Sequence, residues 1–290
     1  MYLIEISRKV FLNGLSKDDL YYALGRFYIA RKIYRFFQII LSFFKKFSTT
    51  QTTIQYTLFN TVFPEVCIDH SIAALRQNSV SLNLTLPSDL VDELREYAHS
   101  TSCLRSGDRK PFIFSEVQAG KLADGVPVVL GFVDNPMACP AVKKICADAT
   151  LLAIVKKHLG YFPEIEPRLL WSFVNEGLTD AYRIDHWQTV KYHFDVDGYN
   201  FIYANFYLSS VNAQSGAHVM IKGSHKGKPL KMLFHSAVQS DEAILNYFGN
   251  EKQLIIEGEP GFGFIQDSAC YHKALAPIKE NRLMLQLRFS

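Results

Sequence analysis

The segment Trp187–Val196 reads WQTVKYHFDV, and its β-branched and aromatic residues predict a β-strand. Within it, His193 and Asp195 lie two positions apart, so on a strand both side chains point to the same face. One histidine and one carboxylate on a strand, joined by a distant histidine, form the facial triad of non-haem Fe(II) enzymes. A His-x-Asp pair also occurs as a hydrogen-bonded surface pair, so its meaning depends on the rest of the sequence.

The remaining ligand must come from further along the chain, where four histidines are candidates: His218, His225, His235 and His272. Residues 257–267, EGEPGFGFIQD, predict a turn followed by a strand, after which the chain reaches Tyr271 and His272. This order favours His272 as the third metal ligand.

Arg282 opens an alternating strand ten residues after His272, with the sequence RLMLQLR. Arginine binds carboxylates through two parallel N–H groups, which suits a co-substrate that chelates a metal and carries a second carboxylate. Arg288 lies on the same face of this strand and is the alternative. We expect Arg282 to hold the co-substrate.

The fold class follows from the pattern around these motifs. Residues 169–290 are mostly short strand runs separated by Gly, Asn, Ser and Pro, which predicts an antiparallel sandwich or barrel. Alternation of apolar residues from Val80 to Leu86 predicts another strand. Two amphipathic helices are expected, over 87–99 and 140–158, the second ending at Gly160. The chain is therefore predicted to be mainly β with flanking helices.

Residues 214–228, QSGAHVMIKGSHKGK, resemble the Asn-Gly-x-hydrophobic-Pro-Gly-Ser-His-Lys signature of the phytanoyl-CoA dioxygenase family. The order of His193-x-Asp195, Gly258-Glu259, His272 and Arg282 agrees with that family over about residues 85–290. Two positions depart from it: Lys222 replaces the usual proline, and Phe194 replaces a common glutamine that would hydrogen-bond the co-substrate.

The resemblance implies a double-stranded β-helix, the jelly-roll core of cupin-like proteins, over residues 81–290. It also implies Fe(II), 2-oxoglutarate and molecular oxygen. Position by position, His193, Asp195 and His272 match the metal ligands and Arg282 matches the residue that binds the distal carboxylate of 2-oxoglutarate. Asn205 matches a co-substrate contact, and His225 a structural residue of the Gly-Ser-His turn. Because halogenating relatives lack the carboxylate ligand, Asp195 favours hydroxylation.

Residues 1–80 form a basic, aromatic N-terminal region outside this resemblance. The stretch 21–64 contains no Asp or Glu, and residues 16–47 predict a helix with one polar stripe: Arg31, Arg35, Gln38, Ser42 and Lys45. In one interpretation this helix packs on the domain or on a second subunit of an oligomer. In the other it lies on a membrane surface, with its cations toward anionic head groups.

Composition limits the remaining possibilities. A net charge of +3 over 290 residues gives no reason to expect a nucleic-acid partner. Five cysteines without C-x-x-C spacing fit a reducing compartment, and we find no secretory signal or membrane span. We expect a cytoplasmic protein, with peripheral contact to the inner face of the membrane as the second possibility.

The substrate is the least constrained feature. The apolar, basic N-terminal region favours a negatively charged amphiphile or a membrane-resident molecule: an acyl-CoA, a lipid or a lipopolysaccharide sugar. The resemblance extends to enzymes that hydroxylate Kdo, an acidic lipopolysaccharide sugar. Two other functions are alternatives, namely a cupin-type metalloenzyme without 2-oxoglutarate and a non-catalytic jelly-roll that binds a lipid or sugar. Arg282 argues against the first, and the complete His/Asp/His/Arg set argues against the second.

Overall fold

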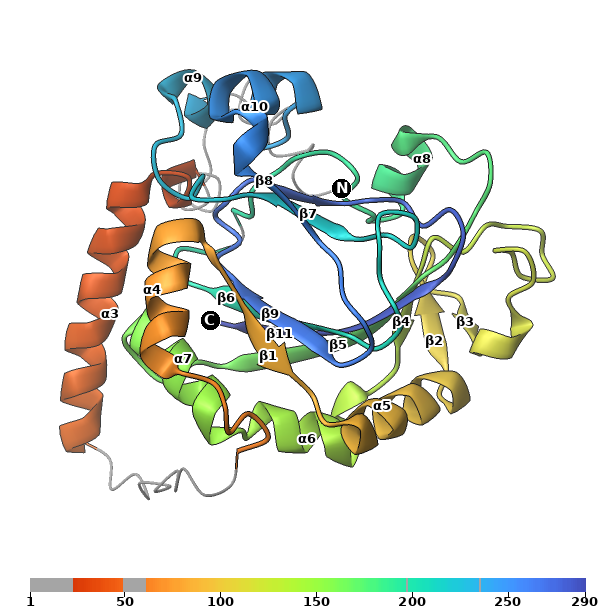
Figure 1. The fold of residues 1–290 in the computed structure, drawn as a ribbon, viewed down its shortest axis with the longest axis horizontal. Coiled ribbons are helices and arrows are strands. Elements are labelled where there is room, and N and C mark those ends of the chain that lie inside the picture. The colour runs from red at the N-terminus through yellow and green to blue at the C-terminus, as the bar shows by residue number, and fades with distance from the viewer. Residues whose placement is uncertain (1–22, 49–60, 197, 235) are drawn as a thin grey trace.

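Two antiparallel sheets face each other in the computed structural model, which describes residues 23–48, 61–196, 198–234 and 236–290 (Figure 1). The large sheet has eight strands in the order β1-β9-β6-β11-β5-β4-β2-β3. Its strands are β1 (Val80–Thr85), β2 (Cys103–Arg105), β3 (Pro111–Phe112), β4 (Leu130–Val133), β5 (Ile165–Ser172), β6 (Ile202–Tyr207), β9 (Phe262–Gln266) and β11 (Arg282–Phe289). The small sheet has the order β10-β7-β8, with β7 (His218–Ile221), β8 (Gln253–Ile256) and β10 (His272–Ala274).

Helices cover the outer faces of both sheets. Below the large sheet in Figure 1 lie α5 (Ser88–Ser100), α6 (Pro140–Cys146) and α7 (Ala149–Leu159), and α4 (Ile68–Asn78) stands to its left. Above the small sheet lie α9 (Leu230–Phe234) and α10 (Asp241–Phe248), while α8 (Asp180–Asp185) is peripheral. The structure also contains three short 3₁₀ helices, Phe114–Glu116, Pro136–Ala138 and Asn250–Lys252.

Strand β11 shows how the sequence divides the interior. Leu283, Leu285, Leu287 and Phe289 belong to the main apolar cluster, which the large sheet forms with the helices beneath it. The alternate residues Arg282, Met284 and Gln286 line a cavity between the sheets. Because side chains alternate along a strand, one face builds the core and the other is left for the site. The predicted mainly β fold with flanking helices is confirmed.

Several predicted elements differ in detail. The helix expected over 140–158 is two helices, because Asp148 interrupts it and caps α7 by accepting a hydrogen bond of 2.8 Å from the Leu151 N–H. Leu82, one of the alternating apolar residues that predicted β1, is 42% exposed where a bulge shifts the register of β1 against β9. Phe63, Ile72 and Leu75, which belong to the N-terminal region 1–80, pack in the same apolar cluster as Leu84 of β1.

Helix α3 (Tyr28–Ser48) stands at the left edge of Figure 1, beside α4 and α7. Its predicted start at Ser16 and the Lys45 side chain lie outside the described residues. Arg31 faces the domain, donating from Nε to the Tyr199 carbonyl at 2.8 Å and pairing with Asp267 at 3.2 Å. Arg35 donates to the Lys157 carbonyl at 3.3 Å. These two arginines therefore point inward, opposite to the orientation expected for cations that meet lipid head groups.

Candidate metal centre

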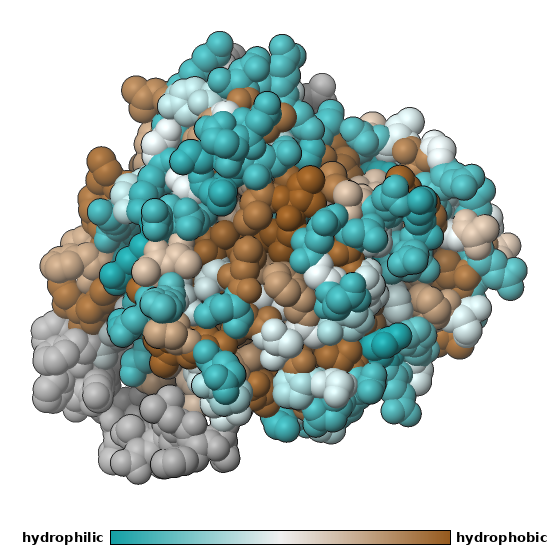
Figure 2. Space-filling model, in the orientation of Figure 1, coloured by the Kyte–Doolittle hydropathy of each residue, from teal (hydrophilic) through white to brown (hydrophobic). Residues whose placement is uncertain are grey.

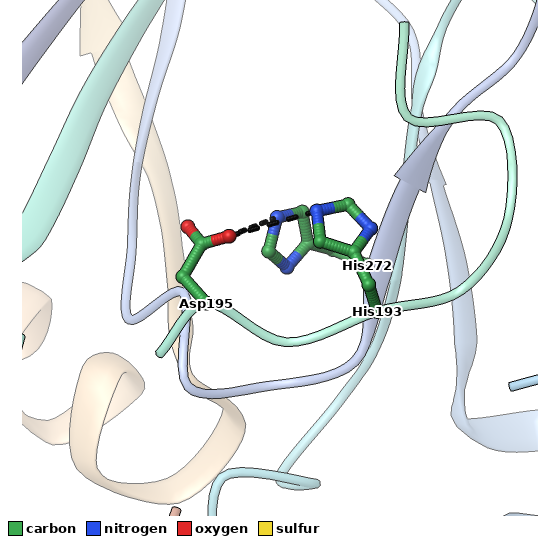
Figure 3. Close-up of side chains that lie close together, drawn as sticks. All are labelled: His193, Asp195 and His272. Carbon is green, nitrogen blue, oxygen red and sulfur yellow. Dashed lines mark ion pairs between the residues drawn. The ribbon is translucent and has the colours of Figure 1, made fainter. Parts of the chain in front are cut away.

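Two imidazoles and one carboxylate converge between the sheets (Figure 3). One potential ligand atom from each of His193, Asp195 and His272 lies within 4.8 Å of the other two. The Asp195 Oδ1 atom is 3.6 Å from Nε2 of His193 and 3.8 Å from Nε2 of His272. Both histidines are buried and Asp195 is partly buried. The structure thus brings together all three residues that the sequence predicted as metal ligands.

The outward nitrogen of each ring is already occupied. Nδ1 of His193 lies 3.0 Å from the Lys191 carbonyl, and Nδ1 of His272 lies 3.0 Å from the Cys270 carbonyl. A carbonyl can only accept, so Nδ1 carries the proton and Nε2 keeps its lone pair. Metal-bound histidines are commonly held by such contacts. The donor set and its tautomers fit a divalent iron ion with open coordination positions.

Burial keeps the His272 ring neutral. It lowers the pKa of His272 to about 4, and the hydrogen bond to the Cys270 carbonyl offsets only part of this effect. Neutral imidazole is the form that binds a metal, so at neutral pH His272 is ready for coordination without first losing a proton.

Backbone hydrogen bonds fix the three ligands relative to one another. His193 and His272 exchange N–H···O bonds of 2.9 and 2.8 Å, and the Asp195 N–H donates to the Ser268 carbonyl at 3.0 Å. Ser224, in the Gly-Ser-His turn, accepts from the Tyr271 N–H at 2.7 Å. The turn that carried the family resemblance therefore supports the residue next to His272, a role the sequence did not reveal.

The segment Trp187–Val196 is not the regular strand that its composition predicts. Among its residues only Tyr192 and His193 form isolated bridges, to Gln239 and His272. The alternation of the segment persists nevertheless. Tyr192, Phe194 and Val196 pack in the apolar cluster that also contains Ile244 of α10, while the intervening His193 and Asp195 line the cavity.

The cavity has a volume of about 360 Å³, which falls in the range of small-molecule sites. Its walls combine the metal-ligand candidates, apolar residues and several polar side chains. They include Leu130, Phe132, Arg168, Leu170, Trp187, Gln188, Tyr203, His218, Gln266, Arg282, Met284 and Gln286.

Arg282 is a cavity residue that is only 4% exposed. Its Nη1 donates to the Gly216 carbonyl and its Nη2 to Ser172 Oγ at 3.1 Å, while Nε has no partner. No carboxylate among the described residues pairs with it. Burial lowers its pKa, although guanidinium keeps its charge in proteins. A buried cation without an anion is costly, so the site suits an anionic ligand.

The other predicted co-substrate residues have partners within the protein. Arg288 pairs with Glu166 at 3.3 Å and is not a cavity-lining residue. Asn205 is buried, and its Oδ1 accepts from Gln286 Nε2 at 3.1 Å. The geometry thus favours Arg282 over Arg288, whereas a co-substrate contact by Asn205 stays a prediction.

The remaining histidine candidates are outside the triad. His218 lines the cavity with its ring 5.4 Å from that of His272, and its Nε2 has no partner. Its pKa lies well below the usual value, mainly because the ring is buried and secondly because of electrostatic repulsion from the neighbouring His272, Arg282 and His193. His225 hydrogen-bonds Ser79 through Nδ1. His235 lies outside the described residues.

The sequence matches no protein-family model and no curated protein. Solved structures do match its fold. SnoK, a non-heme alpha ketoglutarate dependent carbocyclase from nogalamycin biosynthesis, is 11% identical, with a TM-score of 0.54 over 79% of this chain and 86% of that chain. EvdO2 from Micromonospora carbonacea var. aurantiaca, complexed with 2-oxoglutarate, is 14% identical, with a TM-score of 0.53 over 76% and 89%.

HygX from Streptomyces hygroscopicus, with nickel and 2-oxoglutarate bound, is 13% identical, with a TM-score of 0.51 over 78% of this chain and 87% of that chain. At these identities the likeness establishes the fold and nothing further. It confirms the jelly-roll core that the sequence resemblance implied.

Proposed function

We propose that this chain is an Fe(II)- and 2-oxoglutarate-dependent oxygenase that hydroxylates an aliphatic carbon of a small-molecule substrate. The observation that carries this proposal is the sharing of one cavity by a His/Asp/His cluster and a buried arginine without a carboxylate partner. A metalloenzyme without 2-oxoglutarate has no need for that arginine. Arg183, a buried arginine held by the Gln188 amide and the Asn175 carbonyl, is outside the cavity lining, whereas Arg282 lines the cavity.

His193, Asp195 and His272 would hold the iron through two Nε2 atoms and a carboxylate oxygen. Arg282 would bind the distal carboxylate of 2-oxoglutarate through its remaining N–H groups and so orient it toward the metal. When bound, the iron, 2-oxoglutarate and oxygen supply an oxidant able to remove hydrogen from an unactivated carbon. Leu130, Leu170 and Met284 keep the adjoining wall apolar and limit the access of water.

Three further features belong to this proposal. Residues 81–290 would form the oxygenase domain, and residues 1–80 an N-terminal region whose described residues pack on it. Asp195 occupies the position that a halogenating enzyme leaves open to halide, which supports hydroxylation. Among the solved structures with similar folds, SnoK is described as alpha ketoglutarate dependent, and EvdO2 and HygX were solved with 2-oxoglutarate bound, in agreement with the co-substrate proposed for this chain.

The test is anaerobic addition of Fe(II) and then 2-oxoglutarate to the purified protein, followed by visible spectroscopy. Wild type should develop the charge-transfer band of 2-oxoglutarate chelated to iron. Arg282→Met should require at least about tenfold more 2-oxoglutarate, since a charge-assisted hydrogen bond contributes about 1.5–3 kcal/mol. Asp195→Ala should bind Fe(II) at least about tenfold more weakly.

Arg288→Met is the matched control, because it removes an arginine from the same strand face that pairs with Glu166 instead of lining the cavity. Its titration with 2-oxoglutarate should match wild type. Absence of the band in wild type would exclude the proposed function, and a loss confined to Arg288→Met would transfer the co-substrate role to that residue.

We also propose that α3 contacts the inner face of a membrane, which would place the enzyme near a lipid-linked substrate such as a lipopolysaccharide sugar. The supporting observation is its outer face, where Ile29, Ile33, Phe36 and Phe37 are 71%, 53%, 61% and 57% exposed. Hydrophobic atoms are visible along the left edge of Figure 2, where Figure 1 places α3. None of the helices in the described residues is both long and apolar enough to span a bilayer.

Co-sedimentation with vesicles of mixed neutral and anionic phospholipids tests this contact. The double variant Ile33→Ser/Phe37→Ser should lose binding that wild type shows, because apolar burial provides the attachment. Lys32→Ser on the same helix, which removes an exposed cation, should weaken binding only at low salt. Failure of wild type to sediment would rule out the membrane contact, and concentration-dependent dimerisation abolished by the double variant would assign the face to a second copy.

A further inference from the structure

The cavity extends beyond the space that 2-oxoglutarate would fill. Arg282 and Gln286 lie four residues apart on one face of β11, which corresponds to about 13 Å along a strand. If 2-oxoglutarate extends from Arg282 to the metal ligands, as the proposed function requires, it occupies only the Arg282 end. The opposite end of the same wall is built by Arg168, Tyr203, Gln266 and Gln286.

This second end is polar where the first is apolar. Near Arg282 the sheet contributes Leu130, Leu170 and Met284, and toward the other end the corresponding inward positions carry a guanidinium and two amides. Register places Arg168 directly beside Gln286 on neighbouring strands. A substrate lodged there would meet hydrogen-bonding groups in place of a hydrocarbon surface.

Several of these groups have unused hydrogen-bonding capacity. Gln266 is 2% exposed, and its Oε1 has no partner among the described residues. Gln286 donates to Asn205 Oδ1 from Nε2, and no hydrogen bond from the described part of the chain engages its Oε1. Buried polar groups are rarely left unpaired in proteins, so such atoms facing a cavity indicate a polar ligand.

A third cavity amide comes from the loop after α8 and lies toward the Arg282 end, because its contacts lead through Arg183 to Asn175, three residues beyond the Ser172 that pairs with Arg282. Gln188 lines the cavity at 2% exposure, and its Oε1 accepts from Arg183 Nη1 at 2.9 Å. Arg183 is itself held by the Asn175 carbonyl at 2.8 Å. Because guanidinium only donates, the orientation of the Gln188 amide is fixed and Nε2 remains a donor without an acceptor.

Arg168 supplies the charge. Its only ion pair within the described residues is a loose one with Glu166 at 3.6 Å, and its side chain is 46% exposed. A guanidinium so placed can exchange a weak surface partner for an anion that enters the cavity.

We propose that the polar end of the cavity binds the substrate to be oxidised, and that this substrate is a small, hydroxyl-rich molecule bearing a carboxylate or phosphate. Arg168 pairs with the anion, and the amides of Gln266 and Gln286 bind hydroxyl groups. An apolar chain in this position would leave buried amides unpaired, and a site built for hydrogen bonds discriminates strongly against such a ligand. This proposal rests on the proposed function, which assigns the Arg282 end to 2-oxoglutarate.

Calorimetric titration of the Ni(II)- and 2-oxoglutarate-loaded protein compares three probes. D-Glucuronate is anionic and hydroxyl-rich, D-glucose is neutral with similar hydroxyls, and hexanoate is anionic but apolar. Glucuronate should bind at least about tenfold more tightly than either of the others. Arg168→Gln should reduce glucuronate affinity toward that of glucose, and Arg168→Lys should restore part of it. Gln266→Leu should weaken both sugars.

Arg95→Gln, an exposed arginine on α5 remote from the cavity lining, is the matched control and should bind all probes as wild type does. Hexanoate binding as tightly as glucuronate, or unchanged selectivity in Arg168→Gln, would overturn the substrate class. Failure of wild type to bind 2-oxoglutarate at the loading step would count against the proposed function instead. Vesicles displaying a glucuronosyl lipid, compared with free glucuronate, distinguish a lipid-linked source of this chemistry from a soluble one.

Discussion

Ser224 contributes a single oxygen that links the Gly-Ser-His turn to the metal centre. The oxygen donates to the Ile221 carbonyl at 2.8 Å and accepts from the Tyr271 N–H, and the residue is fully buried. Ser224→Ala leaves that N–H unpaired, so we expect unfolding free energy to fall by about 1–3 kcal/mol. Urea denaturation measures the loss. Ser100→Ala, whose hydroxyl bonds within an exposed helix, should change stability by much less.

Lys228 makes stability depend on pH. Burial, with a smaller contribution from repulsion by Arg31, lowers the pKa of its ammonium group from 10.5 to about 7 in the folded protein. Between these values the unfolded chain binds the proton and the folded chain does not, so stability should rise as pH increases from about 7 to 10.5. Below pH 7 both states are charged and this contribution to the pH dependence disappears.

The variant Lys228→Met isolates that effect, because other groups also titrate in this range. Burial raises the pKa of Cys103 to about 12, for example, which opposes the trend at high pH. Denaturation midpoints of wild type and Lys228→Met are measured at intervals from pH 7 to 10. The midpoint of wild type should rise relative to that of the variant as the pH increases, and this relative rise is the contribution of Lys228. Parallel curves would show that its ammonium group titrates normally.

Among individual residues, the candidate metal ligands and co-substrate-binding residues could be predicted from the sequence better than the residues that position them. Spacing brought His193, Asp195, His272 and Arg282 to attention because ligands and carboxylate-binding groups have few alternatives. The Ser268 carbonyl and the orphaned amide of Gln188 carry no comparable pattern. Their importance depends on which groups lie opposite them, and that is decided by tertiary packing.

One face of strand β11 packs in the apolar core, and the other face lines the cavity. Leu285 is fully buried in the cluster beneath the large sheet, whereas Met284 lines the cavity. Leu285→Ala should therefore lower unfolding free energy by about 2–5 kcal/mol. Met284→Ala should lower it less but change the affinity for 2-oxoglutarate. Paired urea denaturation and anaerobic titration distinguish the two faces, and equal stability losses would contradict the division.

Helix α3 is attached through Arg31, whose partner Asp267 directly precedes the Ser268 carbonyl that positions Asp195. Burial would raise the Asp267 pKa, but Arg31, His158 and His225 hold it below its usual range. Arg31→Ala leaves a buried carboxylate unpaired, so we expect a loss of about 3 kcal/mol and faster tryptic cleavage within α3. Lys32→Ala, at an exposed neighbouring position, should leave cleavage near wild type except at its own site.

Element boundaries were harder to predict than element types. The helix over 140–158 was divided because Asp148 also accepts the Val62 N–H at 2.7 Å, a contact with a distant segment. The polar stripe of α3 could be predicted from the sequence, but not whether it faces the domain or the solvent. Polarity alone does not reveal that Asp267 and the Tyr199 carbonyl lie behind Arg31. The alternation of side-chain direction in Trp187–Val196 agrees with the prediction, even though the only β-bridges from the segment to other described residues are the isolated ones at Tyr192 and His193.

Ligand binding should be visible in the stability of the whole molecule. The candidate ligands come from the segment Trp187–Val196 and from β10, which are distant in sequence, so only the folded chain assembles the site and ligand binding must favour it. At about 100 times the Kd, Ni(II) with 2-oxoglutarate should add about 2.7 kcal/mol and raise Tm by roughly 5–10 °C. Calorimetric scans with and without chelator measure this. Asp195→Ala should show no increase, whereas Asp92→Ala on exposed α5 should match wild type.

The order of the large sheet has a consequence for how the chain is made. Strand β11 lies between β6 and β5 although it follows every other strand in sequence, so it alone joins β1-β9-β6 to β5-β4-β2-β3. While a ribosome is still synthesising the chain, both groups present an open central edge, and such edges recruit foreign strands. Folding must therefore wait for a late, long-range closure, and the interval before it is when chaperones matter most for this protein.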